Sequence, residues 1–346
     1  MNFVMNQVTA LRYFMPLVIE GNRRGLQSRF FIEPKPPKYN CCFRNIDVIK
    51  KLSKEFNIQV FRLNDIQNYP NSPTFFIEDQ LIYNVANIKN KKYIIPSMID
   101  YIAYHSKKTS DPGHAPGRYV DHCDNVFMVS EFLASYYDCV SEKNVYLGSP
   151  KYDVALKSQE IFAKYNISPL DKYALVVFPR IRDHRKIDLV SIYDELHSLG
   201  YKIIVKNRGK DHISDKKLAG DLYLEDVDWF PHTTMELIKI SDFIINFSST
   251  TIKESIMLRK PIINFDIKPF KTTPMKYLYE YNFCKNMDSN FSTQQLRESI
   301  VDIQTNDFTK DFDNCIKNHL FENKNVSKNI VDFVMKRQST KNKNEE

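Results

Sequence analysis

The chain has 346 residues, of which 42% are hydrophobic and 26% are charged, and its formal net charge is +7. At roughly 100–200 residues per domain this length predicts two domains, and the composition is that of a globular protein with a sizeable core. Only eight residues are Gly, and neither a G-x-G-x-x-G nor a Walker pattern occurs, which argues against the glycine-rich phosphate loops of those two kinds.

Charge and cysteine content narrow the expected partners and compartment. Part of the basic surplus lies in the polar C-terminal stretch, where residues 336–346 are predicted to be a disordered tail. An arginine-rich arm, an RNP motif and zinc-finger spacing are all missing, so nucleic acid is not an expected partner. The six cysteines form no C-x-x-C pair and are interpreted as free thiols in a reducing cytosol.

No run of 18 apolar residues occurs in the sequence, and its first residues lack the pattern of a secretory leader. These observations predict a cytoplasmic protein. Peripheral contact with the inner face of the membrane stays open, because a mildly basic surface suits an anionic lipid layer as well as an anionic substrate.

The first half of the chain alternates strand and helix patterns. Residues 8–25 have apolar positions at helical spacing and end at a helix stop signal. Amphipathic helices are also predicted at 45–57 and 130–140, the second with Ser130 as its N-cap. Apolar runs predict strands at 26–34, 58–63, 73–79, 91–98, 124–130 and 143–150. Such alternation is typical of a parallel sheet with crossover helices.

The second half restarts the same pattern after residues 148–173. Gly200 fits the position after a helix end, and Thr233 or Thr234 is the predicted N-cap of a later helix. Residues 267–285 are interpreted as a long connection. Strands are predicted at 173–179, 201–207, 221–226, 242–247 and 260–266, and helices at 186–200, 233–240, 250–258, 292–304 and 329–337.

The predicted fold class is therefore α/β, with two Rossmann-like domains facing across a cleft. We expect the first domain over residues 1–155 and the second over 165–310, followed by a C-terminal helix over 311–335. In such folds ligands bind at the carboxyl ends of the strands.

A run of four hydroxyl residues, Ser248, Ser249, Thr250 and Thr251, stands between a buried strand and a helix. The N–H groups and dipole at a helix start favour an anion, and hydroxyl groups add donors, so this run is a candidate phosphate site. Glu254 lies one turn into the helix, where a carboxylate can accept hydrogen bonds from a ribose diol. The alternative is ordinary capping, because S/T-x-x-E is also a capping box.

Two basic loops follow strands at the same predicted edge of the second sheet. Arg180 and Arg182 follow the strand at 173–179, and Lys206 and Arg208 follow the next main strand. Cationic side chains there can neutralise a diphosphate and stabilise it as a leaving group. Each residue taken singly is equally well explained as a solvated surface charge.

Candidate general bases occur in the first half. Asp79 ends a predicted strand, and His114 lies in the loop-like stretch 110–122. Transfer with inversion needs a base near the acceptor hydroxyl. A loop histidine is more often simply exposed.

Several stretches resemble the second domain of GT-B-type enzymes. "INFSSTTIKESIMLRKPIINFD" resembles the strand, "SDYSS" turn and "KPVIFYD" strand of CDP-glycerol glycerophosphotransferases and related capsule or teichoic-acid enzymes. "NVYLGSPKYD" resembles the "GnPxyD" segment that ends a GT-B first domain, and "YALVVFPRIRDHRK" resembles the "YAPTFR" segment that opens the second. The resemblance covers roughly residues 120–270. UDP-GlcNAc 2-epimerases share this fold.

Two histidines of the glycerophosphotransferases have no counterpart in this chain. The stretch "IIPSMIDYIAYHS" stands in place of the early "HG", and "KNRG" stands in place of "KxHP". The family's catalytic base is therefore not carried over. The paired acids and "EAGxR" pattern of the epimerases are absent as well.

The resemblance implies a transferase that moves a sugar or polyol-phosphate group from a nucleotide-activated donor to a cell-surface glycan or lipid-linked acceptor. The first domain would hold the acceptor and the second the donor. The donor is a substrate, so no cofactor is expected, and cationic side chains would take the place of a metal ion. The alternatives are a nucleotide-sugar epimerase or hydrolase of the same fold, and a non-catalytic nucleotide-sugar-binding protein.

Overall fold

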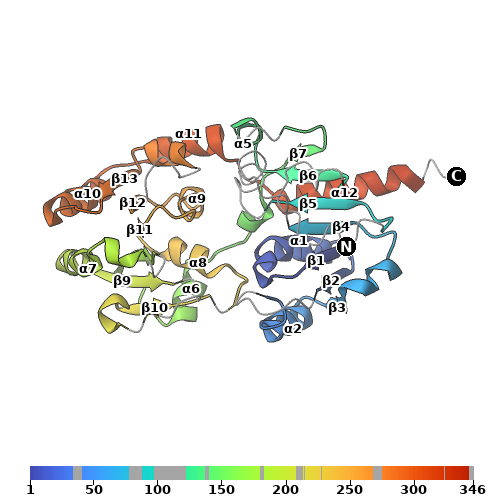
Figure 1. Cartoon of the computed structure of the whole chain (residues 1–346), viewed down its shortest axis with the longest axis horizontal. Helices are drawn as coiled ribbons and strands as arrows, with labels where there is room; N and C mark the ends of the chain where they lie inside the picture. Colours follow the sequence, from blue (N-terminus) through green and yellow to red (C-terminus); the bar gives the residue numbers. More distant parts are fainter. Residues whose placement is uncertain are drawn as a thin grey trace. The chain divides into compact units, whose positions relative to one another are not determined.

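The computed structural model of the chain describes residues 1–33, 41–77, 88–96, 122–136, 140–179, 183–207, 213, 215–226, 228–267, 275–322 and 324–342. They form two compact units, which are Met1–Val154 with His319–Glu346, and Ala155–Asn318. Each unit contains one sheet in which all the described strand pairs are parallel (Figure 1). The two α/β domains expected from the sequence are confirmed.

The first unit has a seven-stranded sheet with the order β3-β2-β1-β4-β5-β6-β7. Aromatic side chains form its centre: the rings of Phe3 and Phe75 stack at 5.2 Å between centroids, and those of Tyr93 and Phe127 at 5.6 Å. Strands covered on both faces become continuously apolar, which explains sequences such as "FVM" and "TFFI". The strands are Asn2–Met5 (β1), Ser28–Ile32 (β2), Ile58–Arg62 (β3), Thr74–Ile77 (β4), Lys92–Ile95 (β5), Asn125–Met128 (β6) and Asn144–Tyr146 (β7).

The helices of the first unit come from both ends of the chain. Helix α12 (Val326–Asn342) packs against α1 (Leu11–Arg23) (Figure 1). Arg24 pairs with Asp332 at 2.6 Å. The unit also contains α2 (Ile46–Glu55) and α5 (Glu131–Tyr136). The N–H of Leu133 donates to Ser130 Oγ at 3.3 Å, which confirms Ser130 as the N-cap of α5.

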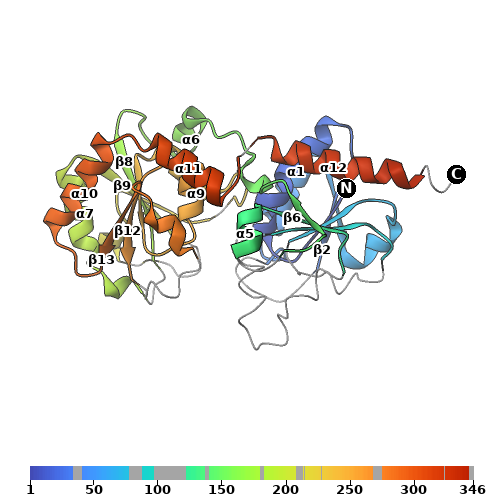
Figure 2. The ribbon, with the colours of Figure 1, turned by 90° about the horizontal axis from the view of Figure 1, so that it is seen from above.

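The second unit has a six-stranded sheet with the order β10-β9-β8-β11-β12-β13. Figure 2 shows its strands between two groups of helices, with α7 and α10 on one side and α6 and α9 on the other. The direction in which strands are added reverses between β8 and β11. This reversal is the topological switch point, where open α/β sheets bind ligands. The strands are Lys172–Val177 (β8), Tyr201–Lys206 (β9), Leu222–Leu224 (β10), Phe243–Asn246 (β11), Ile262–Asp266 (β12) and Cys284–Asp288 (β13).

The helices of this unit begin and end as follows: Ser158–Tyr165 (α6), Leu189–Ser198 (α7), Thr233–Ile240 (α8), Ile252–Met257 (α9), Thr293–Thr305 (α10) and Thr309–His319 (α11). Gly200 follows α7 with φ +80°, as expected for a residue after a helix end. The predicted cap of α8 is wrong. Its N-cap is His232, no side chain caps the helix, and Thr233 is already its first residue.

Three further elements differ from the sequence expectation. Strand β1 was not predicted, and β13 lies partly within the stretch interpreted as a connection. In place of one helix over 311–335 there are two helices, α11 and α12. Helix α12 continues to Asn342, within the stretch expected to be disordered. Among the residues that the structure describes, no helix has the length and apolar character needed to cross a bilayer.

Candidate functional site

The hydroxyl turn (Ser248–Thr251) follows β11 at the carboxyl edge of the second sheet, next to the switch point. Ser248 has φ +48°, a left-handed conformation that is uncommon outside Gly. Ser249 is buried, whereas Thr250 is exposed. The sequence therefore places hydroxyl groups where this class of sheet binds its ligands.

Buried side chains from the neighbouring strand and from a 3-10 turn, Lys276–Glu280, hold the hydroxyl turn. Asn264 Oδ1 accepts hydrogen bonds from the N–H of Ser248 and from Asn246 Nδ2, both at 2.9 Å. The hydroxyl of Tyr279 donates to the carbonyl of Ser249 at 3.0 Å. Two successive residues of the turn are thus fixed through their backbone groups.

These contacts belong to an asparagine network (Asn246, Asn264, Asn286 and Tyr279) across three strands. The three asparagines occupy the same register of β11, β12 and β13. Asn264 Nδ2 donates to Asn286 Oδ1 at 3.2 Å, and Asn286 Nδ2 donates to the carbonyl of Tyr279 at 2.7 Å. Asn246 and Asn264 are almost completely buried, so their amides form hydrogen bonds with protein groups rather than with solvent.

At the start of α9, Ser249 Oγ accepts a hydrogen bond from the N–H of Thr251 at 3.4 Å. Thr251 is the N-cap of α9, but its side chain makes no capping hydrogen bond. The N–H groups of Ile252 and Lys253 donate to the carbonyls of Ser249 and Thr250, at 3.3 and 3.2 Å. Helix α9 has six residues, and its first two N–H groups are bonded in this way, so these two groups already have acceptors within the chain. Any ligand of the turn would instead meet hydroxyl groups.

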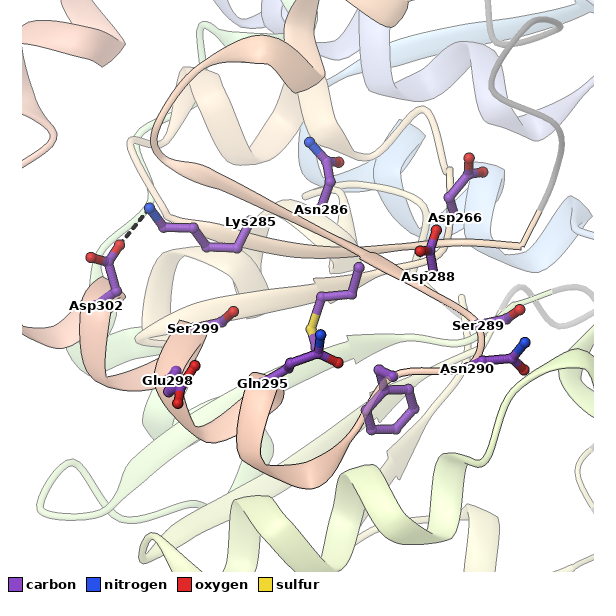
Figure 3. Close-up of a pocket in the computed structure, with 12 residues that line it drawn as sticks. Asp266, Lys285, Asn286, Asp288, Ser289, Asn290, Gln295, Glu298, Ser299 and Asp302 are labelled. Atoms are coloured by element: carbon purple, nitrogen blue, oxygen red, sulfur yellow. Dashed lines mark ion pairs between the residues drawn. The ribbon is translucent and has the colours of Figure 1, made fainter.

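One side of the hydroxyl turn is acidic. Ser248 Oγ donates to Asp266 Oδ1 at 3.2 Å, so its proton points to a carboxylate. Asp266 lies opposite Asp288 in the register of β12 and β13, and Figure 3 shows both at the end of these strands. A phosphate at Ser248 would be repelled by this charge, whereas the hydroxyl groups of a sugar or polyol would find acceptors.

Asp266 and Asp288 also line a pocket of about 770 Å³ between β13 and α10. Lys285 forms an ion pair with Asp302 across it (Figure 3). The lining is mostly polar, with one aromatic ring, Phe291. It consists of Asp266, Lys285, Asn286, Met287, Asp288, Ser289, Asn290, Phe291, Gln295, Glu298, Ser299 and Asp302.

The structure describes six of the predicted site residues. It brings Ser248, Ser249, Thr250 and Thr251 together in one turn and places Glu254 buried in α9. Lys206 ends β9 and is also buried. Its Nζ lies 3.2 Å from Asp226 Oδ1. Asp79, His114, Arg180, Arg182 and Arg208 lie outside the described residues.

Sequence reasoning missed the asparagine network. A signal for it is nevertheless present, because β11, β12 and β13 carry the sequences N-F-S, N-F-D and N-M-D. In each, an Asn precedes a polar residue by two positions. In β12 and β13 this places both on the same face of the strand, whereas Ser248 lies in the turn after β11. Among the residues that the structure describes, no group of three His, Cys, Asp or Glu side chains could hold a metal ion.

Comparisons with known proteins give the fold alone. No protein-family model and no curated protein matches the chain. Solved structures match over nearly its whole length, and they include UDP-GlcNAc 2-epimerases and a wall teichoic acid polymerase, all of the GT-B-like fold. The fold of this chain is therefore GT-B-like.

Three of these structures show the range of chemistry on this fold. A UDP-N-acetylglucosamine 2-epimerase from Listeria monocytogenes, described there as putative, has a TM-score of 0.65 and 10% identity, over 97% of this chain and 95% of its own. The UDP-GlcNAc 2-epimerase of Methanocaldococcus jannaschii with UDP-GlcNAc and UDP has a TM-score of 0.57 and 13% identity, over 96% and 98%. The wall teichoic acid polymerase TagF soaked with CDPG has a TM-score of 0.68 and 16% identity, over 98% and 88%.

Proposed function

We propose that this protein is a transferase that moves a sugar or polyol-phosphate group from a nucleotide-activated donor to a glycan or lipid-linked acceptor of the cell surface. The observation that carries the proposal is the hydroxyl turn, held by buried amides at the switch point of the second sheet. The GT-B-like neighbours, which include structures with UDP and CDPG, support a nucleotide-activated donor.

In this proposal the donor lies along the carboxyl edge of the second unit. Thr250 and Thr251 would donate to its diphosphate, together with Arg180, Arg182 and Arg208 of the basic loops. Ser248 with Asp266, and Glu254, would accept hydrogen bonds from the hydroxyl groups of the ribose or of the transferred group. Ser249 supports the turn from within, since its Oγ lies 3.2 Å from Thr251 Oγ1 and can share a hydrogen bond with it. These cationic and hydroxyl groups would bind the donor without a metal ion or another cofactor.

Lys206 has a different role in this proposal from the one its position in the sequence predicts. Its buried ammonium group is paired with Asp226, which weakens its attraction for a phosphate. We propose that it stabilises the end of β9 through this ion pair rather than binding the donor. Asp79 and His114 stay the proposed bases for activating the acceptor hydroxyl.

A nucleotide-sugar epimerase or hydrolase is the second candidate, because two of the similar structures are UDP-GlcNAc 2-epimerases. The two candidates differ in their need for an acceptor. Incubation of the protein with UDP-GlcNAc alone, followed by chromatography of the sugars, separates them. Epimerised or hydrolysed sugar formed at turnover rates would contradict the transferase.

The first experiment is a thermal-shift screen of the protein with UDP-, CDP-, GDP- and CMP-linked donors. A ligand that binds only the folded state adds about 2.7 kcal/mol of stability at a hundredfold excess over its Kd. We expect one class of nucleotide to raise Tm. If none of the four does, the proposed function is wrong, including its non-catalytic variant. Binding without turnover over a panel of acceptors would instead favour the non-catalytic variant.

The second experiment tests the hydroxyl turn with Ser249→Ala and Glu254→Gln. We expect each change to weaken binding of the nucleotide identified above. Ser241→Ala is the matched control: this buried Ser donates to the Leu237 carbonyl at 2.8 Å and precedes β11, at the opposite edge of the sheet. Ser241→Ala should lower the stability of the protein about as much as Ser249→Ala does, and it should leave the Kd for the nucleotide as in the wild type. Equal Kd values for Ser249→Ala and Ser241→Ala would remove the turn from the site.

A further inference from the structure

We infer that Asn264 and Tyr279 are positioning residues, which set the backbone of the hydroxyl turn for ligand binding. The inference rests on the proposed function, because the turn is its binding element. Neither residue was expected from the sequence to take part in a site. Both are almost completely buried, so they act on a ligand through the turn rather than by touching it.

The orientation of the Asn264 amide is fixed by its surroundings. Its oxygen receives two donors, Ser248 N–H and Asn246 Nδ2, and its nitrogen faces the acceptor Asn286 Oδ1. A flipped amide would turn its NH₂ group toward two donors and its oxygen toward an acceptor. Only one orientation satisfies all three contacts, so Asn264 presents a fixed acceptor to Ser248.

Ser248 needs this support because its backbone is in a left-handed conformation, with φ +48°. That conformation costs a residue other than Gly roughly 1–2 kcal/mol. The hydrogen bond from its N–H to Asn264 offsets part of the cost. Tyr279 then fixes the carbonyl of the next residue, Ser249. Together they select one path for the chain between β11 and α9.

A fixed path matters for binding because Ser248, Thr250 and Thr251 offer their hydroxyl groups from this short turn. Displacement of a binding group by about 1 Å is enough to lose most of its contribution, and rigid support of the contact residues prevents it. We therefore expect weakened support to reduce affinity by more than it reduces the stability of the unit.

The first test compares Tyr279→Phe with Tyr193→Phe. Each change removes one buried hydroxyl that donates to a backbone carbonyl, that of Ser249 at 3.0 Å and that of Leu218 at 3.2 Å. The ring stays in place in both. The Kd for UDP and for CDP is measured by titration calorimetry, and stability by urea unfolding. We expect Tyr279→Phe to weaken binding about fivefold and Tyr193→Phe to leave it unchanged. Tyr279→Phe should lose somewhat more stability, because its hydroxyl also accepts from Asn246 Nδ2 at 3.3 Å.

The second test uses Asn264→Ala, alone and together with Ser248→Gly. Gly adopts the left-handed conformation without strain, so it lowers the dependence of the turn on Asn264. We expect Asn264→Ala to weaken binding by about tenfold or more in the wild-type background. In the Ser248→Gly background the same change should raise the Kd only about twofold. If Asn264 contributed to stability alone, Asn264→Ala would change the Kd by the same factor in both backgrounds.

The outcomes separate this inference from the proposed function. If the wild-type protein binds none of the UDP-, CDP-, GDP- and CMP-linked donors and none of their nucleotides, the proposed function fails and the inference falls with it. If the wild-type protein binds but Tyr279→Phe and Tyr193→Phe have equal Kd values, only the inference is wrong. Equal effects of Asn264→Ala in the two backgrounds would contradict it in the same way.

Discussion

Both sheets bury asparagine side chains, but at opposite ends of their strands. In the first unit, Asn90 Nδ2 donates to the carbonyls of Tyr69 and Ser72 and to Thr74 Oγ1, at 2.8–3.0 Å. Asn2, the first residue of β1, lies beside Thr74, the first residue of β4. This amino-edge cluster (Asn2, Tyr69, Ser72, Thr74 and Asn90) ties down the turn that enters β4.

In the second unit, the asparagine network instead ties down the turn that leaves β11. The chemistry is the same, namely side-chain amides, most of them buried, that satisfy backbone groups. The position differs, and ligands of open parallel sheets bind at the carboxyl ends of the strands. We therefore expect a buried amide to support ligand binding at the carboxyl edge of the second sheet and stability alone at the amino edge of the first. Two changes test this division, and a third, at a helix cap outside both groups, gives a reference for a small effect.

The largest expected effect is on stability at the carboxyl edge itself. Lys206→Met leaves Asp226 without the ammonium group 3.2 Å away, and loss of one member of a buried pair costs about 3–5 kcal/mol. Trp229 is the only tryptophan of the chain and is buried in the second unit, so its fluorescence during urea unfolding measures this loss. We expect a lower midpoint with an unchanged Kd for nucleotide at low urea.

The matched control for this change is Lys202→Met on the same strand. Lys202 pairs with Asp171 at 2.6 Å on the surface, where solvent screens the interaction, so its loss should barely move the midpoint. If Lys206→Met instead has normal stability but no longer binds nucleotide, Lys206 is part of the phosphate site, as the sequence predicts. The carboxyl edge would then be functional from β9 to β12.

An intermediate effect is expected in the first unit. Asn90→Ala removes the amide that satisfies two backbone carbonyls and one hydroxyl, which should lower the stability of this unit by about 1–3 kcal/mol. Hydrogen exchange of peptides from β1 and β4 measures the loss. The Trp229 transition and the Kd for nucleotide should stay as in the wild type.

Asn22→Ala serves as the control for Asn90→Ala. Its amide also donates to a backbone carbonyl, that of Phe56 at 2.6 Å, but it is exposed, so water can replace the bond. A clear loss of nucleotide affinity in Asn90→Ala would break the proposed division between the two edges.

The smallest effect comes from a helix cap outside both asparagine groups. Asp188 caps α7, accepting from the N–H of Ser191 at 3.1 Å and from its hydroxyl at 2.7 Å, and these bonds hold the pKa of Asp188 below its ordinary value. A lowered folded-state pKa adds stability above the ordinary value, and this stability is lost as the pH falls through the folded-state pKa.

We therefore expect Asp188→Ala to cost about 1 kcal/mol at pH 7. The difference from the wild type should shrink once the pH falls below about 4. Urea unfolding at pH 7 and pH 3, followed by Trp229 fluorescence, measures both values. An equal cost at the two pH values would mean that the charge of Asp188 does not contribute.

Most of the fold could be predicted from the sequence, because short apolar runs alternate with amphipathic helices in both halves. Strand β1 was missed because a run as short as Asn2–Met5 gives no readable period. Strand β13 was missed for another reason. It is an edge strand whose alternate residues Asn286 and Asp288 are exposed, and "CKNMD" therefore resembles a polar connection.

The candidate site was predicted in part. Ser248–Thr251 stood out because four hydroxyl residues occur in succession at the end of an apolar strand. Asn246, Asn264 and Asn286 are far apart in sequence, and only the register of three strands brings them together. Sequence alone gives each strand but not this register. The burial of Lys206 beside Asp226 depends on the same kind of long-range pairing.

The return of α12 to the first unit has a consequence for the order in which the chain folds on the ribosome. Residues 1–154 are synthesised first, but the helix that packs on α1 is synthesised only after the whole of the second unit. At about 5–20 residues per second this delay is on the order of ten seconds or more. During that time α1 lacks the helix that packs on it in the folded unit, whereas the second unit is complete before α12 is made.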